Sequence, residues 1–114
     1  MLHIGNHLSC ARGYEAMAKH AILLKADTFG FFTRNPRGSR VKALDMEDIE
    51  KFLHVIREQG FAPLVSHAPY TLNPCGAKEQ VREFARQAMA EDLRRLGDLP
   101  GNYYNFHPGR QVGQ

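Results

Sequence analysis

Thr28-Phe29-Gly30-Phe31-Phe32-Thr33 is the stretch that decides the fold. It is a compact run of aromatic and β-branched residues, which are enriched in strands, so it predicts a buried strand. Helical periodicity flanks it on both sides. Before it, a helix is expected over about residues 13–25. After it, Asp45 is expected to cap a helix together with Asp48 three residues on, and Gly60 is expected to end that helix.

The same alternation of strand and helix runs along the rest of the chain. Strands are expected at about residues 2–7, 61–66 and 103–106, with a third helix at about 77–96. The order is therefore β-α-β-α-β-α-β. Parallel strands joined by right-handed helical crossovers are the economical way to fold that order. The sequence predicts an α/β protein with four parallel strands, a partial (βα) TIM barrel.

Length and composition set the limits of this prediction. The chain has 114 residues, less than half of the roughly 250 in a complete eight-fold barrel, so we expect a single domain over residues 1–114. No apolar run approaches the roughly 18 residues of a membrane span, and the first residues do not resemble a signal peptide. Cys10 and Cys75 provide no disulfide framework. We therefore expect a cytoplasmic protein with no membrane contact. The net charge of +3 permits a polyanionic partner without requiring one.

Histidines stand at the ends of three of the four expected strands. His67 begins His67-Ala68-Pro69-Tyr70, His107 lies in Phe106-His107-Pro108-Gly109, and His7 ends the first strand. The carboxyl ends of parallel strands meet at one edge, where barrels carry their reactive side chains. Because imidazole is the commonest metal ligand, His67 and His107 predict one shared metal. The alternative is a packing role, and no Asp or Glu directly after a strand completes a zinc site.

A basic loop follows the aromatic strand. Arg34-Asn35-Pro36-Arg37-Gly38-Ser39-Arg40-Val41-Lys42 carries four cations, with Pro and Gly shaping the backbone. Guanidinium groups bind phosphate oxygens in bidentate fashion, so this loop predicts a phosphate-contacting arm. A solvated basic loop is an equally good interpretation. Tyr70 either stacks on a base or sugar, or packs over the mouth of the barrel.

Four spaced motifs together resemble the N-terminal part of the endonuclease IV family of apurinic/apyrimidinic endonucleases. The similarity extends over essentially the whole chain, and the combination is specific although each motif alone is weak. The matching stretches are Ile4-Gly5-Asn6-His7-Leu8-Ser9, Phe31-Phe32-Thr33-Arg34-Asn35-Pro36-Arg37, His67-Ala68-Pro69-Tyr70-Thr71-Leu72-Asn73 and Asn105-Phe106-His107-Pro108-Gly109.

The resemblance implies a fold, a cofactor and an activity. Family members are TIM barrels with a trinuclear zinc site, and they cut the DNA backbone on the 5′ side of an abasic nucleotide during base excision repair. By resemblance, this chain would belong to a DNA-repair hydrolase that binds double-stranded DNA with abasic sites. His67 and His107 would then be ligands of one zinc.

The resemblance also suggests which residues bind DNA. Arg37 and Tyr70 would belong to loops that enter the duplex and hold open the damaged site. Asn35 and Arg34, in the same loop as Arg37, would contact the DNA. His7 would line the cleft.

The chain departs from the family pattern in ways that affect activity. Thr71 replaces a commonly apolar residue, and Gln111 replaces a common histidine. The family's bridging glutamate and its other Asp, His and Glu ligands come from later strands, and this sequence ends at Gln114. We therefore expect a truncated chain that is inactive alone.

Two other functions remain open. The chain could be a non-catalytic binding or assembly module, because a half barrel leaves edge strands and apolar surface that favour self-association or a complementing half barrel. It could also be a metal-dependent sugar isomerase or epimerase. The arm at residues 34–42 argues against that, because a small sugar has no backbone for it to hold.

Overall fold

The predicted order of strands and helices is confirmed. The computed structural model describes residues 1–37, 41–99 and 102–109. Over these residues, four parallel strands pair in sequential order: β1 (Gly5–Leu8), β2 (Thr28–Phe32), β3 (Val65–His67) and β4 (Tyr103–Asn105). The same residues form three connecting helices: α1 (Tyr14–Leu23), α2 (Met46–Gln59) and α3 (Glu79–Leu96).

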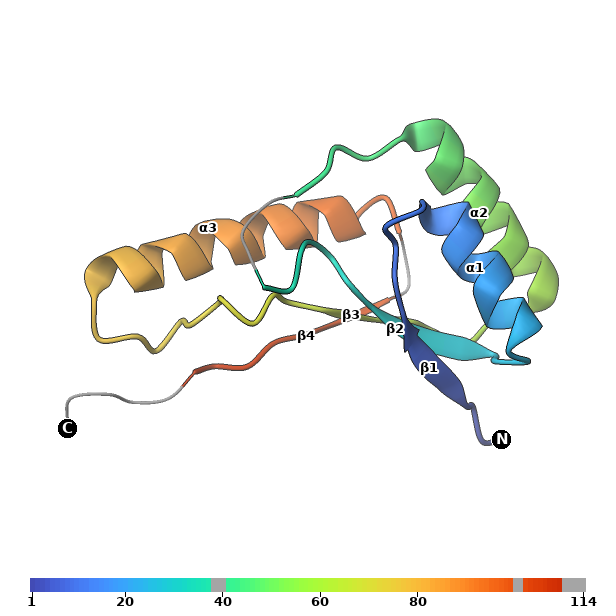
Figure 1. The fold of residues 1–114 in the computed structure, drawn as a ribbon, viewed down its shortest axis with the longest axis horizontal. Helices are drawn as coiled ribbons and strands as arrows, with labels where there is room; N and C mark the ends of the chain where they lie inside the picture. Colours follow the sequence, from blue (N-terminus) through green and yellow to red (C-terminus); the bar gives the residue numbers. More distant parts are fainter. Residues whose placement is uncertain (38–40, 100–101, 110–114) are drawn as a thin grey trace.

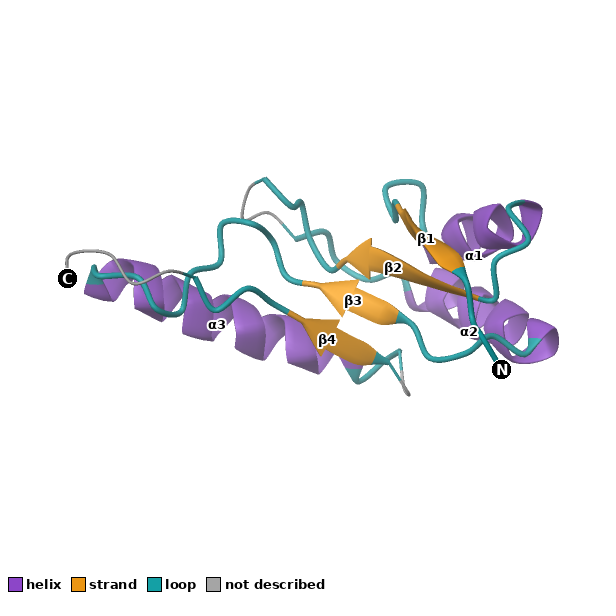
Figure 2. Cartoon of the chain, turned by 90° about the horizontal axis from the view of Figure 1, so that it is seen from below, coloured by secondary structure: helices purple, strands orange, loops and turns teal. Residues whose placement is uncertain are grey.

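All three helices cover one face of the sheet and leave the other face bare (Figures 1 and 2). Phe29 and Phe31 of β2 face the helices and are 2% and 0% exposed. The ring of Tyr14 from α1 meets Phe31 and Phe52 edge-on, at centroid distances of 5.7 and 5.5 Å. Alternation along a strand places Phe32 on the opposite face, where it is half-buried. The predicted buried strand is therefore fully buried only on its helix side.

Several predicted strand bounds differ from the observed ones. β1 begins at Gly5 rather than residue 2, because the pairing with β2 begins at Gly5 and Thr28. β3 begins at Val65 rather than residue 61, because it pairs only with the last three residues of β2. β4 ends at Asn105, so His107 lies two residues beyond the strand.

The first helix ends earlier than predicted. It ends at Leu23 rather than at about residue 25, because Lys25 takes a left-handed conformation, φ 58°. Within the described residues, no helix is both long and apolar enough to cross a membrane.

Two carboxylates cap the first two helices, one of them unexpectedly. Asp45 is the N-cap of α2 as predicted, and its side chain accepts a hydrogen bond from the Asp48 amide at 3.4 Å. The Asp48 carboxylate, however, reaches across to α1, where it accepts from the amides of Tyr14 and Glu15 at 2.6 and 3.1 Å. The N-cap of α1 is Gly13, which has no side chain to do this. Asp48, in the first turn of α2, therefore supplies the hydrogen-bond acceptor for the free backbone amides at the start of α1.

Candidate functional site

The candidate site lies at the carboxyl edge of the sheet, on its bare face. In the register, Phe32 of β2 lies beside His67 of β3, and His67 lies beside Asn105 of β4. His7 of β1 lies beside Gly30 of β2, two residues before Phe32. Since side chains two residues apart share a face, this edge carries imidazole and aromatic groups from neighbouring strands.

His67 and His107 come together as predicted. Their ring centroids are 5.1 Å apart, and the His107 side chain is exposed. Nδ1 of His67 is within hydrogen-bonding distance of the Ala68 carbonyl oxygen. Because a carbonyl only accepts, this contact in the neutral ring requires the proton on Nδ1, which leaves the lone pair of Nε2 for a metal.

The pair by itself supplies only part of a metal site. Zinc needs at least a third protein ligand. Within the described residues, no group of three or more His, Cys, Asp or Glu side chains is placed to hold a metal. The chemistry of His67 and His107 therefore fits zinc as two ligands of a larger set.

His7 lines the same edge and favours its neutral form. Its ring packs on Phe32 at a centroid distance of 4.6 Å. Its pKa is lowered, first by burial and second by the proximity of His67. A methyl group added to Gly30 would lie 3.3 Å from the His7 ring, so glycine leaves room for the histidine.

Tyr70 borders the histidine pair and is available to a ligand. Its side chain is 64% exposed. The ring centroid lies 5.2 Å from that of Phe32 and 6.1 Å from that of His67. The Tyr70 amide also donates to the Pro36 carbonyl at 2.8 Å, which ties the loop after β3 to the loop after β2.

The loop after β2 presents two of its predicted DNA-binding residues to solvent. Asn35 and Arg37 are exposed, and Asn35 Oδ1 accepts from the Arg37 amide at 3.1 Å. This local turn holds Arg37 at the same edge as Tyr70. Gly38, Ser39 and Arg40 of the arm lie outside the described residues, as does Gln111.

Arg34 lies elsewhere than expected. It is 7% exposed, and its guanidinium turns toward α3, where Nε and Nη2 donate to Asp92 Oδ1 at 3.1 and 2.9 Å. Nη2 also donates to Glu91 at 3.1 Å. Burial lowers the pKa of Arg34, but the hydrogen bonds to Asp92 and Glu91 outweigh it and raise the pKa overall. Arg34 therefore anchors the base of the arm, whereas Asn35 and Arg37 lie exposed at its surface.

Asp92 is the residue that sequence reasoning missed. It is fully buried on α3, and its second oxygen accepts from the Tyr104 hydroxyl at 2.7 Å. A signal was present, because Asp92 falls at helical spacing from Ala85 and Ala88 on the buried face of α3. A carboxylate on such a face requires a cationic partner, and Arg34 is that partner.

These features define a class: a parallel βα sheet, covered on one face by helices, with paired imidazoles at the carboxyl ends of its strands. A sequence profile of the family described as xylose isomerase-like TIM barrel matches residues 19–114. The chain belongs to the xylose isomerase-like TIM barrel family.

Known relatives within this fold confirm the resemblance to endonuclease IV. The chain is 55% identical over 114 residues to a probable endonuclease 4 of Alkaliphilus oremlandii and 58% identical to that of Akkermansia muciniphila. The crystal structure of endonuclease IV from Thermus thermophilus matches 96% of this chain with a TM-score of 0.88 and 31% identity. In each case the match covers 41% of the relative's own length.

Proposed function

We propose that this chain is the N-terminal half, a single domain, of a zinc-dependent phosphodiesterase. The complete enzyme cuts double-stranded DNA 5′ to abasic sites in cytoplasmic base excision repair. The observation that carries the proposal is the His67–His107 pair, held at the strand edge with Nε2 of His67 left for a metal. The endonuclease relatives favour this function over a sugar isomerase or epimerase on the same barrel.

The residues divide into metal-holding and DNA-holding groups. His67 and His107 would hold one zinc, which would supply Lewis-acid polarisation of the phosphate and activation of water. Arg37, Asn35 and Tyr70 form an exposed border beside the pair and contact the DNA. The other ligands of a three-zinc site would come from the part of the relatives that this chain does not match, so the chain alone does not cleave DNA.

Calorimetric titration with zinc tests the ligand pair. We expect weak binding, because two imidazoles and water hold zinc less firmly than a complete site. His67→Ala and His107→Ala should each abolish the binding. His54→Ala is the control, since His54 is exposed on α2 and pairs only with Glu58 among the described residues. Unchanged zinc binding in both strand-edge variants would contradict the shared site.

Complementation tests the activity. The purified chain should not nick an abasic duplex with any divalent metal. Mixed with the remaining part of the Alkaliphilus oremlandii relative, it should give metal-dependent nicking that His107→Ala removes. Efficient nicking by the chain alone would show that a complete site forms without the missing strands.

The bare face of the sheet favours a second candidate function, a non-catalytic assembly module. Val65 and Tyr103 on this face are 39% and 65% exposed. Neighbouring strands place these two residues side by side in the register. An apolar sheet face of this kind favours pairing with a second copy or a complementing half barrel.

A further inference from the structure

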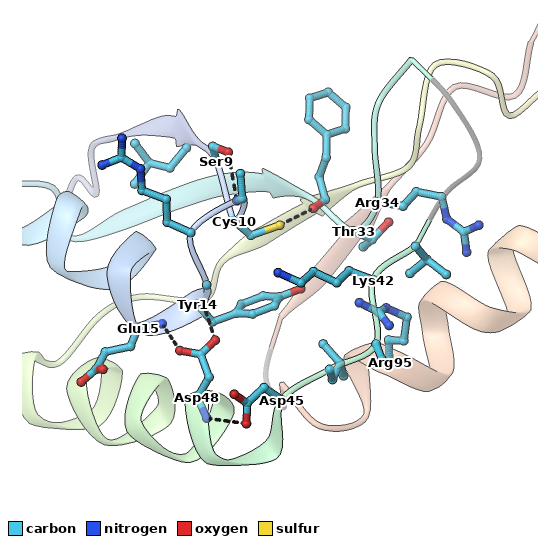
Figure 3. Close-up of a pocket in the computed structure, with 18 of the residues that line it drawn as sticks. Ser9, Cys10, Tyr14, Glu15, Thr33, Arg34, Lys42, Asp45, Asp48 and Arg95 are labelled. Atoms are coloured by element: carbon cyan, nitrogen blue, oxygen red, sulfur yellow. Dashed lines mark hydrogen bonds between the residues drawn. The ribbon is translucent and has the colours of Figure 1, made fainter.

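A second site lies on the helix side of the sheet (Figure 3). It is a cavity of about 1290 Å³ between the loops after β1 and β2, the first turns of α1 and α2, and the end of α3. His7, Phe32 and Asn35 are among its lining residues, but His67, Tyr70 and His107 are not. The cavity can therefore bind a ligand independently of the candidate zinc site.

The acidic groups of this cavity already have partners. Asp48 caps α1, and Asp45 caps α2. Glu15 and Glu47 pair with lysines one helical turn away. Each of these four carboxylates therefore has a hydrogen-bond or ion-pair partner among the described residues.

Three cations of the lining, by contrast, have no carboxylate partner among the described residues. They come from three different elements: Arg12 after β1, Lys42 before α2 and Arg95 near the end of α3. Figure 3 shows Lys42 and Arg95 on the same side of the cavity as the Tyr14 hydroxyl. The charge available to a ligand in this cavity is therefore positive.

Two buried donors of the lining also lack an acceptor among the described residues. Thr33 is only 4% exposed, and its hydroxyl oxygen has no hydrogen-bond partner. Nε of Arg95 is also buried and has no hydrogen-bond partner. Buried polar groups without partners cost stability, so each needs an oxygen atom from a water or a ligand.

We propose that this cavity binds a phosphate group, held by Arg95, Lys42 and the Thr33 hydroxyl. Phosphate oxygens accept several hydrogen bonds at once, and a guanidinium matches their geometry. The phosphate comes either from free inorganic phosphate or from a nucleic-acid backbone, because both present the same oxygens.

Calorimetric titration with inorganic phosphate, at constant ionic strength in chloride buffer, tests the site. Arg95→Gln and Lys42→Gln should each weaken binding by about tenfold, the effect of losing one hydrogen bond to a charged group. Arg94→Gln is the matched control, because Arg94 is exposed on the same helix and outside the lining. His67→Ala should leave phosphate binding unchanged, which separates this site from the proposed zinc site.

Thermal melting of Thr33→Val gives a second test that does not depend on charge. Without phosphate this variant should melt no lower than the parent, because it removes a buried hydroxyl with no partner. Phosphate should raise the melting temperature of the parent and not of Thr33→Val. The proposal is overturned if millimolar phosphate binds nothing, or if Thr33→Val and Arg95→Gln respond to it like the parent.

Competition distinguishes the two sources of phosphate. A short intact DNA duplex is titrated with and without saturating inorganic phosphate. If inorganic phosphate displaces the duplex, and the displacement is lost in Arg95→Gln, the cavity binds a backbone phosphate. If inorganic phosphate does not affect duplex binding, the cavity binds free phosphate. Both results can be interpreted only if the calorimetric titration has first shown that the chain binds inorganic phosphate.

Discussion

Asp92 and Arg34 form a buried ion pair that joins α3 to the base of the loop after β2, with Arg34 Nη2 lying 2.9 Å from Asp92 Oδ1. The two side chains are 0% and 3% exposed. The second oxygen of Asp92 accepts from Tyr104 of β4, so one carboxylate connects three elements. Because Asn35 and Arg37 lie one and three residues after Arg34, this contact holds the arm in place beside the histidine edge.

Removing the carboxylate should therefore destabilise the chain. Asp92→Leu leaves the Arg34 charge buried and without its main partner, and such a break costs about 3–5 kcal/mol. Urea unfolding followed by circular dichroism measures the loss. The double variant Arg34→Met with Asp92→Leu should recover most of it, because the buried site then contains no charge.

Glu91→Gln is the control for this experiment. Glu91 contacts the same guanidinium, but its side chain is 48% exposed, so its loss should cost less than about 1 kcal/mol. A similar midpoint of unfolding for Asp92→Leu and Glu91→Gln would show that the buried pair contributes little.

The cap that Asp48 provides to α1 should be measurable on its own. Asp48→Ala leaves the amides of Tyr14 and Glu15 without their acceptor, and loss of a cap costs about 1–2 kcal/mol. Glu50→Ala, on the exposed face of the same helix, should change the free energy of unfolding far less. Equal effects of the two substitutions in urea titrations would argue against the cap.

Tyr14 should make the chain sensitive to alkali. Burial is the main cause that raises its pKa from 10.0 to about 12, and the nearby Cys10 adds to the shift. The unfolded chain then loses this proton at lower pH than the folded chain. Stability from this group is complete below pH 10 and falls as the pH rises from 10 to about 12.

Tyr14→Phe removes this titration. Over the same interval it should lose up to about 3 kcal/mol less stability than the parent. The free energy of unfolding in urea, measured for both proteins at several pH values from 9 to 12, gives the slope of stability against pH for each. Parallel slopes for the two proteins would show that Tyr14 does not cause the alkaline loss.

The bare sheet face should drive self-association. Burial of apolar surface contributes about 25 cal/mol per Å², so several hundred Å² provide a strong driving force. Val65→Lys and Tyr103→Lys place charges on this face and should shift sedimentation toward monomer. Leu23→Lys, at an 82% exposed position on α1, should leave the distribution unchanged. A monomer with cooperative melting at micromolar concentration would contradict the prediction.

The sequence by itself determined the order of the elements and the pairing of two histidines. Strand and helix periodicity is a local property, and the caps at Asp45 and Gly60 lie beside the helix that they bound. His67 and His107 were predicted to meet because parallel strands end at a common edge. This inference needs no knowledge of side-chain packing.

Only the tertiary structure decided what the charged residues do. Arg34 belongs to a loop that is basic in sequence, yet it is buried because α3 brings Asp92 to it across 58 positions of the chain. Asp48 was expected to act within its own helix, but it caps α1 because α1 and α2 pack side by side on the same sheet face. Local patterns do not encode such partners, since they depend on the distance and rotation at which separate helices pack.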